Sequence, residues 1–146
     1  MENKLFDIKE ANALLPQLNA AFSRISVLRS EIGLLMEDLR SAGFEPLKAS
    51  KKELPQEPAK REKAQRMYKL LDALRAEVEM IEETGGVLKD LEMGLMDFYG
   101  LREGKVVCLC WQHGEPEIMY WHEVETGFNS RQPLSEDTAA TRSRLN

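Results

Sequence analysis

Apolar residues recur with a seven-residue period along the N-terminal part of the chain. Counted from Ile8, nine of the ten a and d positions up to Leu39 are apolar, and the g positions Leu14, Ala21, Leu28 and Leu35 are apolar as well. The apolar stripe therefore covers about three-sevenths of the helix surface, which is typical of a bundle helix with two neighbours. This coiled-coil-like period predicts a helix over residues 7–42.

The ends of this first helix carry signals of their own. Asp7 can cap the first turn, Glu10 can complete a capping box, and Phe6 stands where a hydrophobic staple would. Gly43 can adopt the left-handed conformation that ends a helix. Pro16 removes one backbone donor inside the pattern, so we expect a kink or a restart of the helix there.

A second heptad pattern predicts another helix over residues 59–84, which Gly85 and Gly86 terminate. The segment 44–58 between the helices contains three prolines and three lysines, and we expect it to form a long exposed loop. The two helices then make a long antiparallel hairpin, which cannot cover a three-sevenths stripe by itself. Either the C-terminal segment or a second copy of the chain must cover the rest, and we expect a homodimer.

Beyond the second helix, the apolar period changes from helical to alternating. Three runs predict short strands over residues 95–99, 105–111 and 117–124, separated by turn signals. Three strands need a packing partner, and the helical hairpin is the one available. The expected fold is α+β: a long antiparallel α-helical hairpin followed by a three-stranded antiparallel β-meander (94–124) packed on it.

The whole is expected to form one domain over residues 1–134, followed by a polar tail at 135–146. Within the meander, alternation assigns side chains to two faces. If the second turn is centred near Glu115, Cys110 pairs with Tyr120 and Cys108 pairs with His122, and these four side chains share one face. The opposite, core face then receives the bulky apolar side chains Val107, Leu109, Trp111, Met119 and Trp121.

Composition narrows the class of protein. No apolar run among the 146 residues approaches the about 18 that a membrane span needs. The net charge is −5 and no basic stripe stands out, so we expect neither a membrane nor a nucleic-acid partner. The two cysteines, two positions apart, form no disulfide framework, and a reducing cytoplasm is the expected location.

All cysteine and histidine residues of the chain fall between positions 108 and 122. An antiparallel hairpin brings the two ends of that stretch together. The candidate ligands of a divalent metal are therefore His122, Cys108, Cys110, His113 and Glu115. A mixture of thiolate, imidazole and carboxylate suits zinc better than magnesium. The alternative is that the cysteines are buried as small apolar residues.

His122 is also a candidate general base, because imidazole titrates near neutral pH. The carboxylates that could orient it are Glu115, Asp97 and Glu123, and the candidate catalytic residues are His122, Glu115 and Asp97. Alternatively, His122 is partly buried and hydrogen-bonded for structural reasons. The chain has no Gly-x-Ser-x-Gly motif and no phosphate-binding glycine-rich loop, so the sequence leaves open whether it is an enzyme.

Arg131 is a candidate for binding an anionic small ligand, on which Trp111 or Trp121 would stack. The alternative is an ion pair between Arg131 and a carboxylate that holds the C-terminal segment. Two functional classes follow from these residues. The first is a small-ligand or metal-binding module with a polar site in the C-terminal β unit. The second is a structural or protein-interaction module that acts through its helical hairpin as a homodimer.

Several longer stretches carry a family resemblance. They read FDIKEANALLP (6–16), GLMDF (94–98), LCWQHGE (109–115), WH (121–122) and, with gaps, GF and RQP (127–133). Together they resemble a bacterial family known only as domain of unknown function 2203, over about residues 5–134. The resemblance implies a compact cytoplasmic protein of helices plus a small β unit. It implies no established activity and no catalytic residue to transfer.

Overall fold

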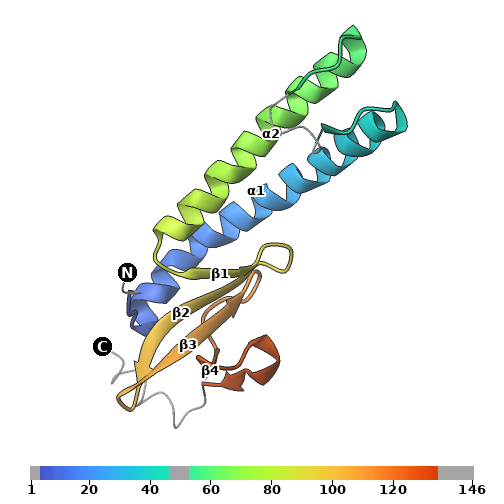
Figure 1. Ribbon diagram of the computed structural model, residues 1–146. Coiled ribbons are helices and arrows are strands. Elements are labelled where there is room, and N and C mark those ends of the chain that lie inside the picture. The colour runs from blue at the N-terminus through green and yellow to red at the C-terminus, as the bar shows by residue number, and fades with distance from the viewer. Residues whose placement is uncertain (1–3, 47–52, 135–146) are drawn as a thin grey trace. The chain divides into compact units, whose positions relative to one another are not determined.

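The computed structural model describes residues 4–46 and 53–134. Two helices come first, α1 (Ile8–Ser41) and α2 (Pro58–Glu83). The elements after them are β1 (Val87–Asp90), β2 (Leu95–Arg102), β3 (Lys105–Gln112), β4 (Tyr120–Glu123), the short 3-10 helix η2 (Phe128–Ser130) and β5 (Gln132–Pro133). The fold is α+β, as the sequence predicts, with the helices before the strands (Figure 1).

The chain divides into two compact units where the sequence suggests one domain. The first unit comprises residues 1–22 and 80–146, and the second comprises residues 23–79. Both helices pass from one unit to the other, since α1 crosses the boundary after residue 22 and α2 crosses it after residue 79. The expected tail at 135–146 lies outside the described residues.

The second unit is a helical hairpin with its own core. Arg24 of α1 pairs with Glu77 of α2, and Asp38 further along α1 pairs with Lys63, so the helices run antiparallel here. The buried core residues are Ile32, Leu39, Ala64 and Met67. Partly buried neighbours pack around them, including the stripe residues Leu28, Leu35 and Met36. The two helices thus cover much of the heptad stripe between themselves.

The local signals at the ends of α1 are confirmed. The Asp7 amide donates to Glu10 Oε1 (3.1 Å) and the Glu10 amide donates to Asp7 Oδ1 (2.7 Å), which is a capping box. Gly43 has a φ of +87°, and the amides of Gly43 and Phe44 donate to the carbonyls of Arg40 and Leu39. This pair of bonds is a Schellman motif.

Two other expectations for the helical part turn out differently. α1 is one helix that runs through Pro16, so the expected restart is wrong. Proline removes a single amide donor, and the buried Leu15 and Leu18 beside it hold the helix against the core. Of the expected loop at 44–58, residues 47–52 lie outside the described residues, while Phe44 and Leu54 pack against the core of the second unit.

The sheet has five strands in the order β1-β2-β3-β4-β5, and every neighbouring pair is antiparallel. The predicted count of three is wrong because the two edge strands are too short to show an alternating pattern. β1 has four residues, two of them exposed, and β5 has two. The register of β3 with β4 is confirmed: Cys108 pairs with His122 and Cys110 with Tyr120.

One face of the sheet packs against the first turns of α1 within the first unit. The ring of Phe22 lies 6.1 Å from that of Trp111. Asn12 Oδ1 of α1 accepts a hydrogen bond of 2.8 Å from the Ile118 amide, which leads into β4. These contacts join sheet and helix only as far as Phe22. Packing of the meander on the whole hairpin therefore stays a prediction.

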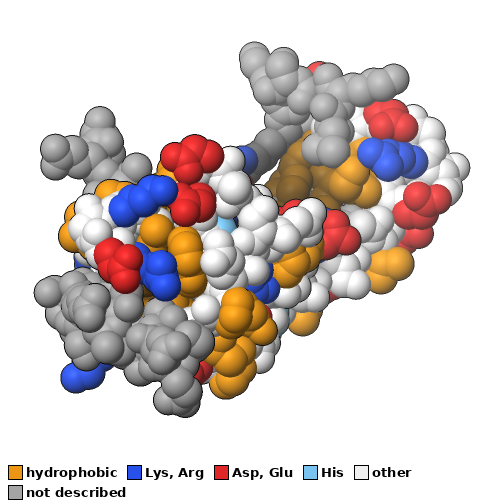
Figure 2. Space-filling view, turned by 90° about the horizontal axis from the view of Figure 1, so that it is seen from below, with side chains coloured by type: hydrophobic (Ala, Val, Ile, Leu, Met, Phe, Trp, Pro, Cys, Tyr) orange, Lys and Arg blue, Asp and Glu red, His pale blue; other side chains and the backbone are white. Residues whose placement is uncertain are grey.

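The surface mixes polar and apolar side chains. On the face that Figure 2 shows, acidic and basic side chains lie among hydrophobic ones. Within the described residues, the large hydrophobic side chains that are most exposed are Val27 and Leu34 of α1, at 60% and 69%. No described helix is long and apolar enough to cross a membrane.

Candidate metal centre

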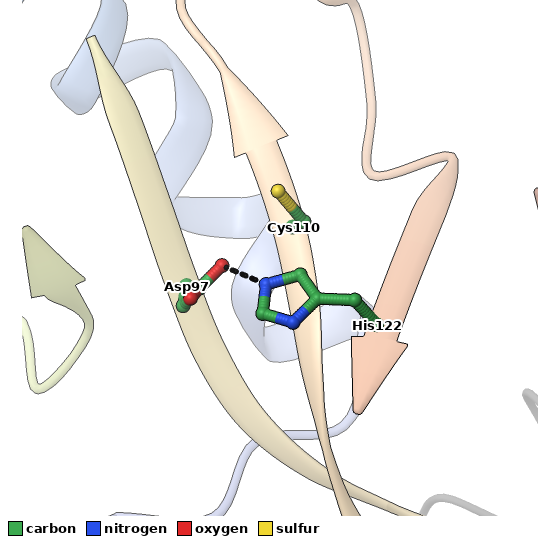
Figure 3. A group of neighbouring side chains, drawn as sticks. All are labelled: Asp97, Cys110 and His122. Atoms are coloured by element: carbon green, nitrogen blue, oxygen red, sulfur yellow. Dashed lines mark hydrogen bonds and ion pairs between the residues drawn. The ribbon is translucent and has the colours of Figure 1, made fainter. Parts of the chain in front are cut away.

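Three polar side chains meet on the face of the sheet opposite to the one that packs against α1. Asp97 comes from β2, Cys110 from β3 and His122 from β4 (Figure 3). Asp97 stands directly opposite Cys110 in the β2–β3 register, and Cys110 stands opposite Tyr120, two residues before His122. Because side chains alternate along a strand, this register places all three on one face.

The donor atoms of these residues are close together and shielded from water. One oxygen of Asp97, the sulfur of Cys110 and one nitrogen of His122 all lie within 4.8 Å of one another. Asp97 is 4% exposed, His122 is 2% exposed and Cys110 is fully buried. Around one tetrahedral zinc, with ligand distances of 2.0–2.3 Å, donor atoms stand about 3.3–3.8 Å apart. The three side chains therefore need only small adjustments to share an ion.

The hydrogen bonds of His122 define which nitrogen faces the other two groups. Nδ1 lies 2.7 Å from the backbone carbonyl oxygen of Glu123, and Nε2 lies 3.0 Å from Asp97 Oδ1. A carbonyl oxygen can only accept, so Nδ1 carries a proton. In a neutral imidazole, the lone pair then sits on Nε2 and points at a carboxylate. Without a cation, a proton must lie between Nε2 and Oδ1.

The two thiols share this polar surrounding. Both cysteines are free and buried. Burial, followed by the negative charge of Asp97, raises the pKa of Cys108 and of Cys110 to about 12. The nearby charge of Arg131 opposes the shift at Cys110, and that of Lys89 opposes it at Cys108. In the absence of a metal, both groups are therefore protonated at neutral pH.

A tight ion pair lies beside the cluster. Arg131 Nη2 donates to Glu115 Oε2 at 2.6 Å, and the guanidinium carbon lies 3.9 Å from the centre of the Tyr120 ring and 4.6 Å from that of Phe128. Glu115 Oε1 also accepts from the Gln112 amide at 2.7 Å. This arrangement corresponds to the alternative in which Arg131 holds the C-terminal segment.

The remaining predicted site residues lie elsewhere. Trp111 and Trp121 belong to the opposite face of the sheet; Trp111 is fully buried and its Nε1 donates to the Glu115 carbonyl. The ring of His113 lies 5.8 Å from that of Phe22, also away from the cluster. Cys108 projects from the same face of the sheet as the cluster, but its sulfur is not one of the three donor atoms that lie within 4.8 Å of one another.

The sequence predicts Asp97 only as a carboxylate that orients His122 or acts with it in catalysis, and not as a metal ligand. A signal was nevertheless present in the chain. Glu103 and Gly104 both have positive φ, at 54° and 80°, as a two-residue hairpin turn requires. Pairing Arg102 with Lys105 across that turn places Asp97 opposite Cys110.

Comparisons with known proteins give one match. The model of a family described as "Uncharacterized conserved protein (DUF2203)" matches residues 4–134. Neither the curated proteins nor the solved structures gave a match.

Proposed function

Because the chain belongs to the uncharacterized conserved family DUF2203, we propose its function from its own geometry: it binds one divalent metal ion between Asp97, Cys110 and His122. The ion we propose is zinc, since a thiolate, an imidazole and a carboxylate together suit zinc better than the oxygen-seeking magnesium or calcium.

The observation that carries the proposal is the orientation of His122. The bond from Nδ1 to the Glu123 carbonyl turns Nε2 toward Asp97 and Cys110. A backbone carbonyl that holds the outer nitrogen of a ligating histidine is a recurrent support in metal sites. A metal cation at this point would replace the proton between Nε2 and Oδ1. It would also compensate the negative charge of the Cys110 thiolate.

The burial of the site favours a structural role for the metal. The three ligands come from three neighbouring strands, so one ion would link β2, β3 and β4. Ligand binding to the folded state alone adds about 2.7 kcal/mol at a concentration 100 times Kd. For a chain of this size, that corresponds to a rise in Tm of about 5–10 °C.

The test is metal analysis of protein purified without a metal-affinity tag. We expect close to one zinc per chain, loss of the zinc on treatment with a chelator, and a rise in Tm when zinc is returned. His122→Gln should abolish both binding and the rise. His113→Gln is the matched control, because it removes the other histidine of the chain, and it should behave as wild type.

Two results would overturn the proposal. One is wild-type protein that contains no transition metal and whose Tm does not change with added zinc, cobalt or cadmium. The other is equal binding by the wild type and the His122→Gln variant, which would place the metal elsewhere.

We also propose, as the second candidate, that the helical hairpin self-associates. Val27 and Leu34 are seven positions apart, so they project from the same side of α1, and both are largely exposed. Val27 also lines a groove of about 470 Å³, together with Ser23, Arg24, Leu28, Ala73 and Glu77. A second copy of the same helix face would cover these apolar side chains in a symmetric contact.

Sedimentation at tens of micromolar tests self-association. We expect twice the chain mass of 16.7 kDa, and a monomer for the double variant Val27→Lys/Leu34→Lys. A wild-type protein that sediments as a monomer of 16.7 kDa would contradict this candidate without bearing on the metal site.

A further inference from the structure

We propose that Cys108 is the fourth ligand, so that the metal sits in a closed site of one aspartate, two cysteines and one histidine. This inference rests on the proposed metal-binding function and extends it from three ligands to four. It also makes the site a structural zinc site and not a catalytic one, because a zinc ion with four protein ligands has no position left for water or substrate.

The first argument is that three ligands leave one coordination position of a zinc ion unfilled. Zinc in proteins is almost always four-coordinate, and in catalytic sites the fourth position holds water. Here Asp97 and His122 are at most 4% exposed and Cys110 is not exposed at all. Solvent therefore has little access to the group, and the missing donor should come from the protein.

The second argument is the position of Cys108. It stands directly opposite His122 in the β3–β4 register, and it projects from the same face as Cys110 because it precedes Cys110 by two residues. Its side chain is 3% exposed and it forms no disulfide. The other histidine, His113, lies beside Phe22 instead, so no other cysteine or histidine in the chain can complete the set.

The third argument is the small movement that the assignment requires. Cys108 is already on the cluster's face of the sheet, opposite the ligand His122. A change of χ1 rotamer moves a thiol sulfur by about 3 Å with the backbone fixed, and this is the movement by which Cys108 would join the group.

The direct test uses the intact wild-type chain loaded with zinc. X-ray absorption at the zinc edge counts sulfur neighbours, which stand near 2.3 Å, separately from nitrogen and oxygen neighbours near 2.0–2.1 Å. We expect two sulfur and two nitrogen or oxygen neighbours per zinc. A spectrum with one sulfur neighbour would overturn the assignment of Cys108 while leaving the proposed metal site in place.

Cobalt substitution provides an independent test with variants. Thiolate-to-cobalt charge transfer absorbs in the near ultraviolet in proportion to the number of thiolate ligands, so Cys108→Ser should lower the intensity per cobalt to about half. Cys110→Ser should lower it equally. Unchanged intensity in Cys108→Ser would overturn the inference alone, and a wild-type protein that binds neither zinc nor cobalt would overturn the proposed function with it.

Discussion

The Nε2 atom of His122 lies 3.0 Å from Oδ1 of Asp97, although 25 positions separate the two residues and both are almost fully buried. A buried imidazole that already donates through Nδ1 can face a carboxylate only if a cation lies between them. That cation is a proton or a metal ion.

Substitutions of Asp97 separate its structural role from its metal-binding role. In Asp97→Asn, the amide NH₂ group can donate to the lone pair of a neutral His122, so we expect a loss of less than about 1.5 kcal/mol in metal-free protein. Asp97→Ala leaves the buried Nε2 of His122 without a partner and should cost about 3 kcal/mol. Both variants should lose zinc affinity by at least about 10–100-fold. Urea unfolding in a chelator and zinc titration measure the two effects, and normal zinc affinity in Asp97→Asn would exclude Asp97 as a ligand.

The pair of Arg131 and Glu115 should contribute more to stability than the exposed ion pairs. Arg131 is enclosed by two aromatic rings and donates to Glu115, and the side chains are 10% and 19% exposed. Lysine cannot reproduce the planar stacking, so Arg131→Lys should cost about 1–2 kcal/mol. Arg66→Lys, at the exposed pair in which Arg66 Nη2 donates to Glu31, is the matched control and should leave the urea midpoint unchanged. Equal midpoints for both variants would contradict this assignment.

Two glycines of the second unit should respond to alanine in opposite directions. Gly33 lies inside α1, and an added Cβ would meet nothing within 4 Å. Gly33→Ala should therefore stabilise the protein by about 0.5–1 kcal/mol, through the helix propensity of alanine. Gly43 has a φ of +87°, so Gly43→Ala should destabilise it by about 1 kcal/mol. Thermal unfolding of both variants checks the signs, and a lower Tm for Gly33→Ala would contradict the first.

Metal-free protein should lose stability as the pH rises above 9. The pKa of each cysteine is about 12 in the folded chain against an ordinary value of 9.0. Between these values the unfolded chain binds fewer protons than the folded one, so the free energy of unfolding falls with rising pH. The contribution of the two protonated thiols to the free energy of unfolding is fully present below pH 9.

The matched comparison for this pH dependence is the double variant Cys108→Ala/Cys110→Ala. Lysine and tyrosine residues titrate in both proteins, so the difference between their slopes isolates the thiols. Urea midpoints in a chelator at about pH 8 and about pH 10.5 measure the slopes. Parallel slopes would show that the two thiols ionise as readily in the folded chain as in the unfolded one.

Local signals in the sequence were enough for the two helices, for three of the five strands and for part of the site. The capping box of Asp7 and Glu10 and the left-handed Gly43 depend only on neighbours within a few positions, and heptad and alternating periods show which side of an element is apolar. The turn near Glu115 likewise predicted the pairing of Cys108 with His122, because a hairpin register follows from its turn.

The tertiary structure alone decided the remaining features. β1 and β5 exist because neighbouring strands supply their hydrogen bonds, and so few residues carry no period of their own. Helix α1 continues through Pro16 because packing of buried side chains outweighs one missing donor. Asp97 joins Cys110 and His122 because β2 lies beside β3 in a sheet. No local pattern in the sequence encodes how distant segments of the chain pack. That packing sets the distances across the three strands and the burial of the cluster, on which its chemistry depends.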